Sequence, residues 1–70
     1  MKEYTVIYEP GAANWSAYVP DLPGCVATGK NREETERRIR EAIEFHIEGL
    51  QSHGDPVPDP TIEAGKVAVS

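Results

Sequence analysis

Four side chains in this sequence could support a catalytic or metal site, those of Cys25, His46, His53 and Asp21. A catalytic thiol needs a nearby base and an electropositive setting, and nothing in the local sequence places a histidine beside Cys25. One cysteine and two histidines also lack the ligand spacing of a zinc site. We therefore predict no catalytic residue, no metal and no cofactor, and we interpret Cys25 as a small buried residue.

Asp21 lies in the constrained turn Pro20-Asp21-Leu22-Pro23-Gly24-Cys25, where its carboxylate is expected to bond the turn backbone. A metal-dependent nuclease would need several convergent carboxylates, and Glu3 and Glu9 form no evident cluster with Asp21. No glycine-rich phosphate loop is present. A residual metal-dependent nuclease is therefore kept only as an alternative, to be tested by RNA cleavage with Mg²⁺ or Mn²⁺.

The elements that would position these residues begin with three predicted strands, over residues 4–8, 15–19 and 25–28. The turn signal Pro10-Gly11 separates the first two, which predicts an antiparallel hairpin. The first strand has no clearly polar face, so we expect it to be covered on both sides. Trp15 and Tyr18 fall on opposite faces of the second strand.

A helix is predicted from Asn31, a good N-cap, with Glu34 completing a capping-box pattern. Its apolar stripe, at spacings of three and four, consists of Thr35, Ile39, Ala42, Ile43, His46, Ile47 and Leu50. The outer face is predicted to carry the ion pairs Glu33–Arg37, Glu34–Arg38 and Glu36–Arg40. The helix is expected to end near Gly54, with Gly49 as an earlier alternative.

After the helix, three alternating prolines predict an extended connector over residues 55–60. Residues 61–69 are expected to begin as a loop and to end as a strand. The element order is therefore strand, strand, strand, helix, strand, which is an α+β fold.

Size and charge restrict the function. At 70 residues, apolar burial contributes on the order of 100 kcal/mol and ordering the chain costs about the same, so association is an expected source of stability. The net charge of −5 argues against direct nucleic-acid binding and an anionic membrane surface, and favours a basic protein partner. Without a signal peptide or an apolar span, the expected location is cytoplasmic.

In order along the chain, the segments YTVIYEP, WSAYVPDLPGC, ATGKNREE and AIEFHIEGL resemble the HicB family, the antitoxins of HicA/HicB toxin–antitoxin pairs. The resemblance implies a reduced ribonuclease-H-like fold (βββαβ) that pairs into dimers or larger assemblies through its sheet and C-terminal strand. It also implies that the domain binds HicA, a small basic RNA-cleaving toxin. A separate DNA-binding domain is common in the family, whereas here we expect a single HicB-like domain over residues 1–70 without one.

The main hypothesis is thus a non-enzymatic antitoxin domain that neutralises a HicA-type toxin. The alternative is an orphan oligomeric interaction module, or a small-ligand-binding module, without a toxin partner. The candidate partner-binding residues are Asp21, Leu22, Pro23, Gly24, Glu41, Glu44 and Glu48. The candidate residues of a homo-oligomer interface are Tyr4, Trp15, Val67 and Val69.

Overall fold

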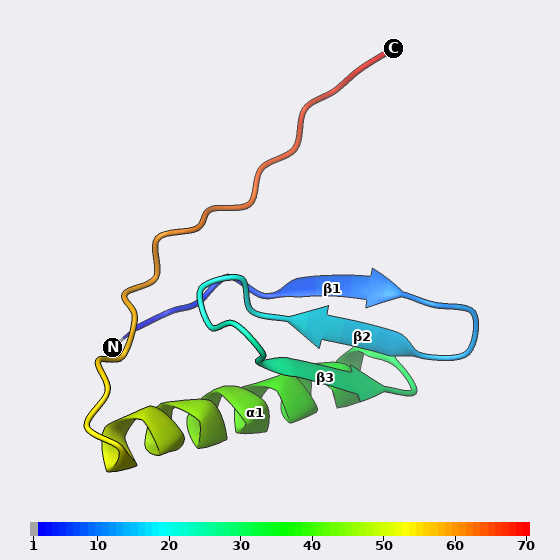
Figure 1. The fold of residues 1–70 in the computed structure, drawn as a ribbon. Coiled ribbons are helices and arrows are strands. Elements are labelled where there is room, and N and C mark those ends of the chain that lie inside the picture. Colours follow the sequence, from blue (N-terminus) through cyan, green and yellow to red (C-terminus); the bar gives the residue numbers. More distant parts are fainter. Residues whose placement is uncertain (1) are drawn as a thin grey trace.

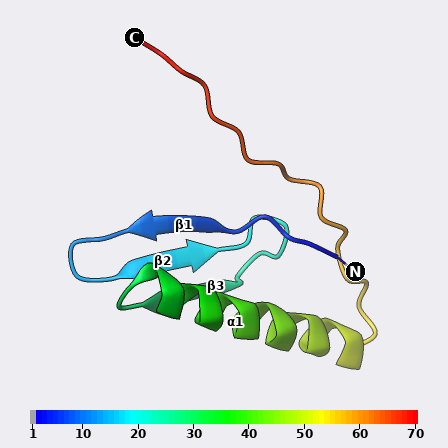
Figure 2. The same cartoon turned by 180° about the vertical axis from the view of Figure 1, so that it is seen from behind.

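The computed structural model describes residues 2–70 and contains three strands followed by one helix. The strands are β1 (Ile7–Pro10), β2 (Trp15–Tyr18) and β3 (Val26–Gly29), and the helix α1 spans Arg32–Ser52. They form an antiparallel sheet in the order β1-β2-β3, with α1 along one face (Figure 1). The view from behind shows the same two layers (Figure 2). The predicted α+β class and three-stranded antiparallel sheet are confirmed.

The first strand begins later than predicted, at Ile7 instead of Tyr4. The register pairs Ile7 with Tyr18, so residues 4–6 lie opposite the point where the chain leaves β2. Pro20 has no N–H to donate there, and the chain turns away, so the ladder cannot continue.

The core is small and lies between β2, β3, α1 and the turn that joins β2 to β3. Its buried apolar residues are Ala17, Val19, Leu22, Cys25 and Ile39. Leu22 has no exposed surface, because the turn folds its side chain inward. Backbone hydrogen bonds from Leu22 N–H to Val19 O and from Cys25 N–H to Leu22 O shape that turn. Gly24, with φ of 85°, supplies its left-handed position.

The start of α1 follows the prediction for the Asn31 cap, whereas the Glu34 side chain bonds the residue before the cap and not Asn31 itself. The Asn31 side chain accepts a hydrogen bond from Glu34 N–H at 2.8 Å, and Glu34 Oε1 accepts one from Lys30 N–H at 3.0 Å. The bond from Lys30 is the main cause of a lowered pKa for Glu34, which therefore stays ionised at the positive end of the helix. The helix ends at Ser52, just before Gly54, as predicted.

The ion-pair prediction for the outer face is confirmed in one case of three. Glu34 pairs with Arg38 at 3.6 Å. Glu36 pairs backward with Arg32 at 3.5 Å instead of forward with Arg40, and Glu33–Arg37 is not formed among residues 2–70. Both neighbours of Glu36 lie four residues away, so spacing alone does not choose between them. Exposed pairs of this kind contribute little to stability.

The C-terminal strand is not confirmed. In the part of the chain that the structure describes, residues 55–70 contain no helix or strand, and the last ten are exposed. They leave the body of the molecule and extend into solvent (Figure 1). A strand needs a neighbouring chain to satisfy its N–H and C=O groups, and this segment has none within the described chain. The ribonuclease-H-like arrangement, which requires that strand, is likewise not confirmed. We call residues 61–70 the tail.

Two glycines provide a matched test of the packing between β3 and α1. A Cβ at Gly29 would lie 2.6 Å from Thr35 Oγ1 and 2.8 Å from the backbone nitrogen of Thr35, whereas a Cβ at Gly49 would meet nothing within 4 Å. We expect Gly29→Ala to lower the free energy of unfolding by about 1–3 kcal/mol, because the helix must move away from the strand. Gly49→Ala is expected to raise it by up to about 1 kcal/mol, because alanine favours the helix. Thermal and denaturant unfolding measure both, and equal effects of the two substitutions would contradict this account.

Candidate functional site

Asp21 does not bond its own turn; it holds the tail. Its Oδ2 accepts hydrogen bonds from the N–H groups of Thr61 and Ile62, at 3.1 and 3.2 Å. Its Oδ1 accepts one from the Thr61 hydroxyl at 2.9 Å. We call these three contacts the tail anchor. The sequence interpretation of Asp21 as a residue that bonds the turn backbone is therefore wrong, because the acceptors are occupied by a segment forty residues away.

The tail anchor acts on the ionised carboxylate. Desolvation by the surrounding chain raises the pKa of Asp21, but the hydrogen bonds from Ile62 and Thr61 together outweigh it and hold the pKa below its ordinary value. An ionised carboxylate accepts such bonds more strongly than a neutral acid does. At neutral pH the tail is therefore held in place where it leaves the domain.

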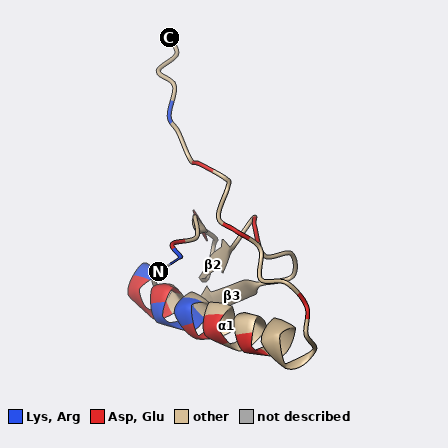
Figure 3. Ribbon diagram, turned by 90° about the vertical axis from the view of Figure 1, so that its left-hand side faces the viewer, with Lys and Arg blue, Asp and Glu red and all other residues tan. Residues whose placement is uncertain are grey.

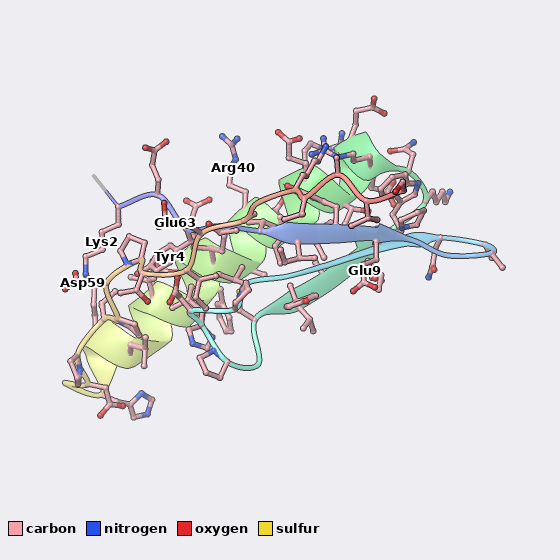
Figure 4. All side chains as sticks on the ribbon, turned by 90° about the horizontal axis from the view of Figure 1, so that it is seen from above. Lys2, Tyr4, Glu9, Arg40, Asp59 and Glu63 are labelled. Atoms are coloured by element: carbon pink, nitrogen blue, oxygen red, sulfur yellow. The ribbon has the colours of Figure 1, made fainter. Side chains whose placement is uncertain are left out.

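The N-terminal segment holds the neighbouring connector. The Tyr4 hydroxyl donates to Pro58 O, and the Thr5 hydroxyl donates to Ile62 O at 2.8 Å. The Lys2 ammonium donates to the carbonyl of Val57 and pairs with Asp59, both at 3.1 Å. Figure 4 shows Lys2, Tyr4 and Asp59 close together where the connector crosses the start of the chain. These contacts fix the point and direction of departure of the tail.

The other residues of the turn divide between core and surface. Pro23 and Gly24 are exposed, whereas Leu22 is fully buried. Leu22 is thus a core residue and is left out of the partner surface proposed below. Cys25 is also buried, as expected, and burial raises the pKa of its thiol, which keeps it protonated and weakly nucleophilic.

The two histidines lie along the second half of α1 and its end. His46 is half-buried, and the His53 Nδ1 lies 2.8 Å from Gly49 O at the helix C-terminus. Across residues 2–70, no group of three or more His, Cys, Asp or Glu side chains is arranged to hold a metal ion.

The three predicted partner-binding acids of the helix, Glu41, Glu44 and Glu48, share its exposed side and form no salt bridge with any described residue. They belong to a longer acidic stretch, residues 41–65, which has no Lys or Arg. Its acids are Glu41, Glu44, Glu48, Asp55, Asp59 and Glu63. With six acids and seven bases outside it, the rest of the chain sums to +1. In Figure 3 the Lys and Arg positions of α1, coloured blue on the ribbon, are confined to the first half of the helix.

The four predicted interface residues do not form one patch. Tyr4 packs on the core edge, and Trp15 is half-buried opposite Gly29 in the sheet register. Val67 and Val69 are 86% and 88% exposed in the tail. A groove of about 520 Å³ lies beside Tyr4, between the N-terminal half of the hairpin and α1. The apolar residues that line it are Tyr4, Val6, Tyr8, Ile39 and Ile43.

The groove exists because α1 packs mainly on β3 and β2 and leaves the inner side of β1 partly open. At one end of that open side, the Arg32 guanidinium lies over the Tyr8 ring, 4.2 Å from its centroid. Arg32 is the first residue of α1, so this cation–π contact joins the start of the helix to β1.

Residues 4–68 match the family described as the HicB-like antitoxin of bacterial toxin–antitoxin systems. The chain belongs to the HicB-like antitoxin family. The match covers the hairpin, the turn, the helix and most of the tail, so the resemblance read from the sequence is confirmed. Antitoxins of this family are generally non-catalytic, and membership implies a toxin partner in general.

Several relatives support the assignment. A UPF0150 protein of Thermoplasma acidophilum is 35% identical over 90% of this HicB-like chain and 91% of its own length. A UPF0150 protein of Synechocystis is 41% identical over 79% of this chain and 71% of its own length. An uncharacterized 14.9 kDa protein from the rep-hol intergenic region of Haemophilus phage HP1 is 34% identical, with 41% of its own length covered. No solved structure gave a significant match. Within residues 2–70, no helix combines the length and the apolar character needed to cross a membrane.

Sequence reasoning missed two features of this HicB-like domain. The tail anchor has no local signal, since Asp21 and Thr61 are forty residues apart. The exposure of Phe45 could have been predicted from the sequence, because this aromatic residue lies off the apolar stripe of the helix.

The tail anchor is tested by Asp21→Ala. We expect faster hydrogen exchange at the amides of Thr61 and Ile62, by about tenfold or more, because each loses its acceptor. The melting temperature should change little, since the tail adds no core residue. Asp59→Ala, which removes an exposed ion pair with Lys2, is the control and should leave both amides unchanged.

The same amides report the pH dependence of the anchor. Because folding lowers the pKa of Asp21, the anchor is complete above the ordinary Asp pKa and is lost as the pH falls through the lowered value. NMR titration of Thr61 and Ile62 should show this transition in wild type and not in Asp21→Ala. A transition above the ordinary Asp range would contradict the assignment.

Proposed function

We propose that this HicB-like domain binds and neutralises a small basic RNA-cleaving toxin of the HicA type. Family membership supports an antitoxin role. The acidic stretch is the observation that carries the specific proposal, because it concentrates a charge of −6 over 25 residues with no internal cation. Such a surface attracts a basic protein and speeds its association.

Occlusion is the mechanism that the geometry supports. A toxin that binds RNA must present cations at its active site, and the carboxylates of Glu41, Glu44 and Glu48 are free to pair with them. Acidic side chains would then occupy the place of the RNA phosphates.

The proposed partner surface combines these helix acids with the exposed part of the turn, Pro23 and Gly24. Asp21 contributes as the residue that anchors the tail, since its carboxylate oxygens already accept three hydrogen bonds. The cytoplasmic location expected from the sequence is part of the same proposal, because cellular RNA is the toxin's target.

The proposal is tested by looking for a gene for a small basic protein beside the gene for this chain, and by assaying that protein as the candidate HicA-type toxin. We expect the purified domain, at ten times the dissociation constant, to suppress RNA cleavage by about 90%. Co-expression should restore growth to cells that make the toxin. Unchanged cleavage by a toxin that is otherwise active would overturn the proposal, and so would the absence of any small basic neighbour gene.

We also propose that the domain self-associates through its tail. The observation that favours this is the pair Val67 and Val69, which alternate along an extended segment and lie in solvent. The groove between β1 and α1 offers apolar surface of the matching kind, next to the outer edge of β1, which pairs with no strand of residues 2–70. A tail from a second copy that pairs with this edge would become the predicted C-terminal strand and bury both valines.

Sedimentation at micromolar concentration tests the self-association. We expect wild type to sediment as a dimer or larger assembly, and Val67→Ser/Val69→Ser to shift it toward monomer. Loss of two buried valines in each tail should weaken association by about 100-fold. Ala64→Ser/Ala68→Ser is the matched control in the same segment. A monomeric wild-type protein would contradict the proposal and would leave antitoxin function as a separate question.

A further inference from the structure

Phe45 is the most exposed large apolar residue of α1, with 77% of its surface accessible. It is the only phenylalanine in the sequence and lies off the stripe that packs on the sheet. An exposed aromatic side chain in a helix contributes nothing to the core of its own domain. Aromatic residues are enriched among the residues that dominate protein–protein binding energy.

A shallow hollow of about 320 Å³ lies beside this ring. It is lined by Phe45, His46, Gly49, Leu50, His53 and Asp55. Gly49 creates the space, because it has no side chain and a Cβ there would meet no atom within 4 Å. The hollow is large enough for one aliphatic or aromatic side chain of a partner.

Charge surrounds this apolar centre. Glu41 precedes Phe45 by four residues and Glu48 follows it by three, so both lie on the same side of the helix. On the side of the helix that carries Phe45, the nearest basic residue toward the helix start is Arg38, seven residues earlier, which is already bonded to Glu34 and to the carbonyl of Thr28. An apolar centre with an acidic border is complementary to a basic surface that carries an apolar side chain.

We propose that Phe45 and the hollow at Gly49 form the anchor point of the toxin on this domain, where an apolar toxin side chain flanked by Lys or Arg is seated. This inference rests on the proposed function and specifies its contact. A second copy of this chain fits poorly, because two acidic stretches would face each other and repel. A basic partner gains both the apolar contact and the pairing with Glu41 and Glu48.

Two substitutions test the anchor point against two matched controls. Phe45→Ala removes the ring, and Val26→Ala removes an exposed apolar side chain, 64% accessible, on the opposite face of the sheet. Glu48→Lys reverses a border charge, and Glu9→Lys makes the same change at the far end of β1 (Figure 4). All four sites are exposed, so none of the four variants is expected to be less stable than wild type by more than about 1 kcal/mol.

Binding is measured by calorimetry against a catalytically inactive variant of a small basic HicA-type toxin. We expect Phe45→Ala to raise the dissociation constant by about 30-fold or more, and Val26→Ala to raise it by less than about twofold. Glu48→Lys should weaken binding about tenfold at low salt and less at high salt, and Glu9→Lys should have a smaller effect.

The outcomes separate this inference from the proposed function. Tight toxin binding that is equal for wild type and Phe45→Ala would overturn the anchor point and leave the antitoxin function standing. No binding of the toxin to wild type would overturn the proposed function itself. A Phe45→Ala variant with normal toxin binding and altered sedimentation would show that the patch joins copies of this chain, which also contradicts the inference.

Discussion

One helix covers a three-stranded sheet incompletely, and most features of this domain depend on that mismatch. Because α1 packs mainly on β3 and β2, the inner side of β1 stays partly open as a groove lined by Tyr4, Val6 and Ile43. Within residues 2–70 the tail beyond Ile62 has no neighbouring strand, although it carries two exposed valines. The groove and the tail each leave apolar surface uncovered, and the self-association proposed above would cover both.

The turn between β2 and β3 connects the core to the tail. Leu22 points inward and closes the core, whereas its neighbour Asp21 points outward and accepts three hydrogen bonds from Thr61 and Ile62. The same tight backbone, fixed by two prolines and the positive φ of Gly24, therefore orients both side chains. A tail that leaves the domain in a defined direction loses less conformational entropy when it binds a partner.

Local patterns in the sequence predicted what local physics determines. The Asn31 cap, the end of α1 and the hairpin follow from capping, periodicity and turn residues within a few positions. The partner of Asp21 could not be predicted, because it lies forty residues away and backbone N–H groups carry no sequence signature. The tail shows the opposite limit. Its pattern predicted a strand, and a strand forms only where a neighbouring strand edge pairs with its N–H and C=O groups.

The distribution of charge along α1 is the strongest argument that its second half serves a partner. A helix is stabilised by acids near its start and bases near its end, each by about 0.3–1 kcal/mol. Glu33 and Glu34 obey this rule in the first turn, where Glu34 also accepts a hydrogen bond from Lys30 N–H. The end of the helix violates it, with Glu48 one turn from Ser52 and no basic residue in the last turn. Helix stability therefore explains the acids in the first turn, but it does not explain the acids in the second half of the helix, which destabilise it. A charge arrangement that costs stability, next to an exposed Phe45 that adds none, is what a binding surface for a basic partner requires.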